Sequence, residues 1–200
     1  MTLDRLRPLA DRALRPFVAG SVRLGLTPDV VSVIAFVLAV GAAIGFYRAT
    51  PLAYVVGALL VFLNGWLDLL DGALARQLAV DSRAGDLLDH VLDRYADVVI
   101  VGGLAAGIEG YALGFLSVTG VLLTSYLGTQ AEAVGLTREY GGLLGRADRL
   151  ALVGVTGLAM AIVPRVAGMS LVAWLLVLFA VVGHLTALQR FWGAWRDLSS

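Results

Sequence analysis

The chain has 200 residues, of which 59% are hydrophobic and only 15% are charged, and its mean hydropathy is +0.86. Fifteen basic and fifteen acidic residues give a net charge of zero, and there is no cysteine. This composition excludes a soluble globular domain, a disulfide framework and a thiolate metal site. It indicates an all-α protein of the membrane, for which we expect no nucleic-acid partner.

The N-terminal segment alternates apolar and arginine residues. Leu6, Leu9 and Leu14 alternate with Arg7 and Arg12 within residues 3–20. Such a pattern is typical of an amphipathic helix that lies along a membrane surface. We therefore predict a juxtamembrane surface helix within residues 1–25.

Six apolar segments follow, most of them near the length of about 20 residues that crosses a bilayer. They cover residues 30–47, 52–75, 86–108, 111–135, 148–163 and 169–190, and the fifth is short. The connections between them are tight, which predicts one domain over residues 1–200 with a six-helix bundle at 30–190. The predicted fold is an all-α membrane protein with six transmembrane helices and a polar cavity that faces the cytoplasm.

The arginine residues predict the orientation of this bundle. With a cytoplasmic N-terminus, every arginine except Arg48 and Arg165 falls on or near the cytoplasmic side. Basic residues are enriched on that side of membrane proteins. We therefore expect an integral protein of the cell membrane with both termini and the active site in the cytoplasm.

Four aspartates interrupt the second and third apolar segments. They are Asp68, Asp71, Asp89 and Asp93 in the pattern D-x2-D-G-x2-A-R-x8-G-x3-D-x3-D. Carboxylates at such positions are costly to bury, so a cation or a reaction has to stabilise them. Spacings of three and four place each pair on one helix face, and the two pairs can converge. Oxygen ligands of this kind favour Mg²⁺, Mn²⁺ or Ca²⁺.

Small residues accompany the aspartates. Gly72, Ala75 and Gly85 leave room for a flat ligand or a neighbouring backbone. Arg76 offers planar, permanently charged donors that suit phosphate or a base edge. The arrangement indicates a nucleotide diphosphate ligand, and Asp81 and Ser82 in the connecting loop are candidate contacts to it. The alternative is that these are helix-packing residues with incidental ion pairs.

This pattern resembles the signature of the CDP-alcohol phosphotransferases. The resemblance implies that the four aspartates hold a pair of divalent ions, Mg²⁺ or Mn²⁺, which bind the diphosphate of a CDP-linked lipid. It also implies that Asp93 is the general base and that CMP is released. The family's N-terminal half-motif is similar to Thr27–Ser32, which adds Pro28 to the donor-binding residues and has Asp29 where relatives commonly have asparagine.

Residues 125–150 resemble the branch of this family that makes phosphoinositol lipids. The resemblance implies inositol 1-phosphate as acceptor and CDP-archaeol or CDP-diacylglycerol as donor. Arg146 and Arg149, spaced by three, can form a clamp for the acceptor's phosphate, and Arg138 can join them. Both can equally be ordinary cytoplasmic charges at the head of the fifth span. Gly128, Thr129 and Gln130 stand where bacterial members have basic residues, which favours the archaeal version.

Three other functions fit parts of the pattern. A sister phosphotransferase with glycerol 3-phosphate or serine as acceptor differs only in the acceptor. A UbiA-type prenyltransferase also binds a diphosphate through aspartates, and a divalent-cation transporter would use the carboxylates as a permeation site. The pairs Gly103/Gly107 and Gly110/Gly114 favour close helix contact, within the bundle or across a homodimer, and the family resemblance implies a homodimer.

Overall fold

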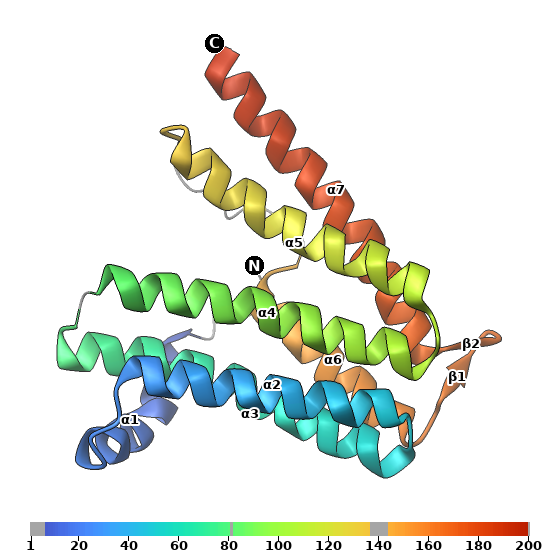
Figure 1. The fold of residues 1–200 in the computed structure, drawn as a ribbon, viewed down its shortest axis with the longest axis horizontal. Coiled ribbons are helices and arrows are strands. Elements are labelled where there is room, and N and C mark those ends of the chain that lie inside the picture. Colours follow the sequence, from blue (N-terminus) through green and yellow to red (C-terminus); the bar gives the residue numbers. More distant parts are fainter. Residues whose placement is uncertain (1–6, 81, 137–143, 200) are drawn as a thin grey trace.

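The computed structural model describes residues 7–80, 82–136 and 144–199 (Figure 1). In this part the chain forms seven helices and one short hairpin. The helices are α1 (Arg7–Arg23), α2 (Pro28–Arg48), α3 (Pro51–Leu78), α4 (Arg83–Gly107), α5 (Tyr111–Ala133), α6 (Arg146–Met160) and α7 (Leu171–Ser199). The hairpin pairs β1 (Arg165–Val166) antiparallel with β2 (Met169–Ser170).

Each predicted segment corresponds to one of these helices, and the all-α prediction is confirmed except for the hairpin. The last helix was expected from residue 169, but Met169–Ser170 pair with β1 instead. Ala167 (φ 51°) and Gly168 (φ +80°) make the turn of this hairpin. Helix α7 therefore starts only after the hairpin, at Leu171. The helix then continues to Ser199, past the predicted end at residue 190.

Among the described residues, four helices are long and apolar enough to cross a membrane: α2, α3, α5 and α7. These helices are consistent with an integral membrane protein. Helix α4 has 25 residues, but acidic and basic side chains interrupt it. Helix α6 has only 15 residues, fewer than the about 20 that a bilayer needs. The prediction of six spans therefore remains a prediction for α4 and α6.

The helices form a bundle in which several helices that are distant in the sequence pack together. Helix α2 lies against both α3 and α4, α6 lies against α3, and α5 pairs with α7 (Figure 1). The core contains the fully buried Phe46, Leu104, Leu176 and Phe179. A Cβ on Gly103 would fall 2.7 Å from Cα of Ala43, so this glycine serves close packing of α4 on α2 within the chain.

Side chains cap the starts of three helices. The Thr27 hydroxyl accepts a hydrogen bond from the Val30 N–H at the start of α2, and the Ser82 hydroxyl accepts one from the Gly85 N–H at the start of α4. At the start of α6, the Gly145 N–H donates to Oδ2 of Asp148, 3.0 Å away. These side chains satisfy amide groups that the first helical turn leaves without partners. The starts of α2 and α4 lie beside the C-terminal part of α3, at the candidate site.

Candidate active site

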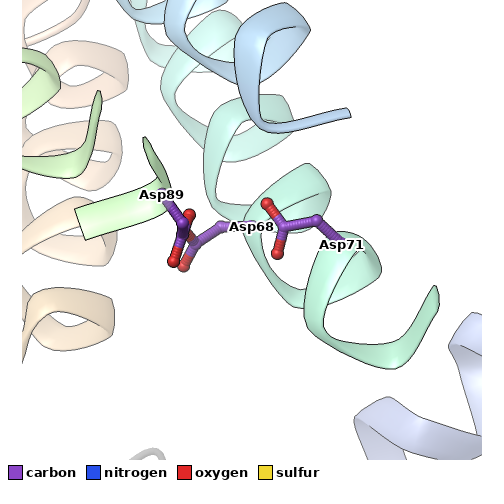
Figure 2. A group of neighbouring side chains, drawn as sticks. All are labelled: Asp68, Asp71 and Asp89. Carbon is purple, nitrogen blue, oxygen red and sulfur yellow. The ribbon is translucent and has the colours of Figure 1, made fainter. Parts of the chain in front are cut away.

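Three aspartates converge between α3 and α4. Asp68 and Asp71 come from α3 and Asp89 from α4, and one carboxylate oxygen of each lies within 4.8 Å of the others (Figure 2). Asp71 is buried, and the other two are partly buried. Three carboxylates this close repel one another, and a divalent cation relieves that repulsion. The donor set is all oxygen, so it fits the hard cation that the sequence predicts.

Asp93 lies one helical turn beyond Asp89 and is connected to the cluster by Arg146. Nη2 of Arg146 lies 2.7 Å from Oδ1 of Asp93, and Nη1 of the same guanidinium forms an ion pair with Asp68. The Asp93 side chain is 17% exposed and that of Arg146 is 15% exposed. Arg146 was predicted as an acceptor ligand, and its contact with both carboxylates was not foreseen from the sequence.

Ser32 is a site residue that sequence reasoning did not single out. Its Oγ lies 2.7 Å from Oδ2 of Asp71, to which it donates a hydrogen bond, and both side chains are buried. A fixed donor of this kind orients a carboxylate that binds metal. Ser32 closes the half-motif that begins at Thr27, so its position in that motif was an available signal.

The predicted donor-binding residues line a small cavity beside the cluster. Its volume is about 90 Å³, and its walls include Pro28, Gly72, Ala75, Ser82 and Gly85. Ligand pockets commonly measure about 300 to 1,000 Å³. This cavity is smaller, so only part of a nucleotide would fit into it. The Ser82 hydroxyl also caps α4, which accounts for it without a ligand. Asp81 lies outside the described residues.

Arg76 does not line this cavity. It lines a separate cavity between α1 and α3, although its Nη1 comes within 3.5 Å of where a Cβ on Gly72 would be. Arg76 therefore lies at the boundary between the two cavities. Its predicted contact with a nucleotide requires the guanidinium to reach across Gly72.

Gly85 lets the start of α4 approach Asp29. A Cβ on Gly85 would lie 2.9 Å from Oδ1 of Asp29, closer than ordinary van der Waals contact. Asp29 also lines the cavity of about 90 Å³. This contact agrees with the prediction that Gly85 leaves room beside the site.

The predicted acceptor-binding arginines lie on a larger cavity between α4, α5 and α6. Its volume is about 510 Å³, and its lining includes Arg146 and Arg149 together with Arg94 and Arg190. Nη2 of Arg149 lies 3.0 Å from Oδ2 of Asp97, and both side chains are buried. Arg94 forms a hydrogen bond with Ser125, and its Nη2 lies 3.6 Å from Oδ2 of Asp93.

Two of these cavity residues were absent from the sequence prediction, and one predicted residue is not described. Arg94 and Arg190 come from α4 and α7, and no local pattern linked them to α6 before the fold was known. Nη1 of Arg190 donates to the carbonyl oxygen of Thr124, 2.6 Å away. Arg138 lies outside the described residues.

A family model described as CDP-alcohol phosphatidyltransferase matches residues 25–182. The chain therefore belongs to the CDP-alcohol phosphatidyltransferase family of enzymes. This membership confirms the family prediction and decides against the prenyltransferase and the cation transporter.

Similar proteins include members of the branch that the sequence predicted. The archaetidylinositol phosphate synthase of Methanothermobacter thermautotrophicus is 29% identical over 98% of this chain and 95% of that protein. The crystal structure of Mycobacterium tuberculosis phosphatidylinositol phosphate synthase with CDP-DAG bound has a TM-score of 0.78 and 29% identity, covering 92% of this chain and 94% of that one. The same enzyme in complex with manganese and citrate also has a TM-score of 0.78, with 28% identity over 91% of this chain and 88% of that one.

Proposed function

We propose that this enzyme transfers a phosphatidyl or archaetidyl group from a CDP-linked lipid to a hydroxyl of inositol 1-phosphate and releases CMP. The observation that carries the proposal is the convergence of Asp68, Asp71 and Asp89 next to Asp93 and Arg146. A diphosphate-binding acidic cluster and an arginine-lined cavity thus adjoin one another. The relatives named above are an archaetidylinositol phosphate synthase and a phosphatidylinositol phosphate synthase.

The acidic cluster supports a divalent-metal-dependent reaction. Asp68, Asp71, Asp89 and Asp93 would hold Mg²⁺ or Mn²⁺, which supplies charge neutralisation at the diphosphate when bound. Ser32 keeps the Asp71 carboxylate in one orientation. The cavity lined by Pro28, Gly72 and Ala75 would take the nucleotide end of the donor, with Ser82, Gly85 and Arg76 at its edges.

Asp93 is the proposed general base. Its carboxylate forms ion pairs with Arg94 and Arg146, two residues that line the arginine-lined cavity, and Arg146 also pairs with Asp68 of the metal-binding cluster. A base has to reach the acceptor hydroxyl whose proton it removes. A carboxylate held between the donor side and the acceptor side meets that geometric requirement.

The arginine-lined cavity supports an acceptor that carries a phosphate. Arg146 and Arg149 line it from the start of α6, and a guanidinium binds phosphate through parallel hydrogen bonds. The volume of about 510 Å³ is within the usual range for a small-molecule pocket. Arg138 is proposed from the sequence alone as a third contact.

The second candidate is the same chemistry with glycerol 3-phosphate or serine as acceptor. Glycerol 3-phosphate shares the phosphate that Arg146 and Arg149 would bind, so the arginines do not separate it from inositol 1-phosphate. Serine has no phosphate, and its singly charged carboxylate would be the group that these arginines bind. We also propose a homodimer in the cell membrane, with six spans and with both termini and the active site facing the cytoplasm.

The test is CMP release by the purified full-length protein with each acceptor in parallel. CDP-archaeol and CDP-diacylglycerol are supplied in turn, with inositol 1-phosphate, glycerol 3-phosphate, serine or free inositol, in Mn²⁺ or Mg²⁺. We expect release with inositol 1-phosphate to exceed that with each other acceptor by at least about tenfold in kcat/KM. A preference for glycerol 3-phosphate or serine would transfer the proposal to the second candidate.

Chelation supplies the control on the metal. EDTA is expected to stop CMP release, and re-addition of Mg²⁺ or Mn²⁺ is expected to restore it. Full activity in EDTA after exhaustive dialysis would contradict the metal-dependent reaction.

A further inference from the structure

One cavity among the described residues lies outside the candidate active site. It has a volume of about 740 Å³ and lies between α1 and α3. Its lining combines three arginines, one glutamine and four small or branched apolar residues: Arg15, Val18, Ala19, Val22, Arg23, Ala73, Arg76 and Gln77. No acidic residue is among these described lining residues, so the cavity is strongly cationic.

The lining follows from how α1 packs on α3. Leu14 and Val18 are buried in one cluster with Leu70 and Leu74. The rings of Phe17 and Trp66 pack edge to face, with 5.4 Å between their centroids. These contacts hold one side of α1 against the C-terminal part of α3, at one end of the bundle (Figure 1). The adjoining stripe of α1, from Arg15 to Arg23, is left to line the cavity beside α3.

The chemistry of the lining selects its occupant. The guanidinium groups of Arg15 and Arg23, which the donor does not use, favour a phosphate. Val18, Val22 and Ala73 add a hydrocarbon wall that a soluble anion does not need. An amphipathic helix with arginines near it places this wall at the level of the lipid headgroups. A ligand with a phosphodiester and the first carbons of its chains matches both kinds of wall.

We propose that this cavity binds an anionic membrane phospholipid at a site separate from the donor site. The phosphodiester lies between Arg15 and Arg23, because Arg76 is assigned to the edge of the donor cavity, and the chains leave along the apolar side of α1. Arg76 adjoins Gly72 of the donor cavity, so the bound lipid lies next to the donor without occupying its place. The site goes beyond the proposed transfer reaction and does not depend on which acceptor is used.

The test measures lipid binding by the full-length protein in nanodiscs, using native mass spectrometry and a fluorescent phosphatidylglycerol. Phosphatidylcholine with the same chains is the neutral comparison. We expect one retained phosphatidylglycerol per chain. We expect Arg15→Gln with Arg23→Gln to weaken its binding by about thirtyfold, since each basic residue near an anionic surface contributes between about fivefold and sixfold. Ala19→Trp, which puts a bulky ring into the cavity without changing the charge, is expected to reduce retention.

The matched control is Arg48→Gln with Arg196→Gln, which removes the same charge from exposed positions away from the cavity. Equal loss in this control would overturn the proposal in favour of general surface attraction. Undiminished retention by the Ala19→Trp protein would also overturn it. Displacement of the lipid by CMP would assign the cavity to the donor site, and displacement by inorganic phosphate would make it a site for soluble anions.

Discussion

Arg146 holds Asp93 in a close ion pair, with 2.7 Å between Nη2 and Oδ1, while its other terminal nitrogen pairs with Asp68. One guanidinium thus offsets part of the charge of two carboxylates at the proposed metal site, and Arg146 also lines the proposed acceptor cavity. The two proposed sites therefore share this residue.

Replacing Arg146 with glutamine is expected to have two opposite effects. The acceptor KM rises about tenfold or more, because a charged hydrogen bond to the acceptor's phosphate is lost. The Mn²⁺ concentration needed for half-maximal activity falls, because the cation no longer competes with a guanidinium for Asp68 and Asp93. Initial rates over a grid of acceptor and Mn²⁺ concentrations measure both, with Arg196→Gln as the control. An unchanged acceptor KM would remove Arg146 from the acceptor site.

Asp93→Asn and Asp71→Asn are expected to abolish turnover and leave the protein folded. Asparagine is nearly isosteric with aspartate but has neither the charge nor the basicity, and the loss of a general base alone costs at least about a hundredfold. CMP release gives the activity, and detergent-solubilised thermal unfolding checks the fold. Asp197→Asn, on the exposed end of α7, serves as the matched variant. Substantial CMP release by either site variant would show that the roles are misassigned.

Arg149→Gln is expected to destabilise the protein as well as raise the acceptor KM. Its guanidinium is buried 3.0 Å from Asp97, and removal of one partner of a buried pair costs about 3 to 5 kcal/mol. The double variant Arg149→Gln with Asp97→Asn should recover much of this loss, since no buried charge is then left alone. Unfolding midpoints of the four proteins complete the cycle. Additive losses would mean that the pair is not energetically coupled.

Ser32→Ala is expected to weaken metal binding about tenfold to a hundredfold, as the loss of a donor to a metal-binding carboxylate commonly does. The Ser32 hydroxyl is the buried donor 2.7 Å from Oδ2 of Asp71. Mn²⁺ binding followed by electron paramagnetic resonance measures the affinity without turnover. Ser199→Ala is the control, and equal affinity in all three proteins would refute the role of Ser32.

Gly85→Ala is expected to raise the KM for the CDP-lipid several-fold with little change in stability. The added methyl comes 2.9 Å from Oδ1 of Asp29, a flexible side chain that can turn away but then enters the donor cavity. Combining it with Asp29→Ala removes the conflict and should restore the donor KM to that of Asp29→Ala alone. If the donor KM is not restored, the effect of Gly85→Ala would instead come from a change in the backbone of α4.

Local patterns in the sequence were sufficient to predict the helices and the acidic faces. Apolar runs of about the length of a bilayer located most helix ends within a few residues. The exception is α7, which starts only after a short hairpin at Met169–Ser170 and continues to Ser199 instead of ending at residue 190. Asp68 and Asp71, like Asp89 and Asp93, are three or four residues apart, and helix geometry alone puts such pairs on one face. The family motif also followed from spacing.

Contacts between distant segments were decided only by tertiary structure. Ser32 meets Asp71 across 39 positions, and Arg149 meets Asp97 across 52 positions. The partners of Arg146 and the side of α3 on which Arg76 lies depend in the same way on how each helix is rotated and shifted against its neighbours. Helical periodicity determines which residues share a face, but side-chain packing between helices determines which faces meet.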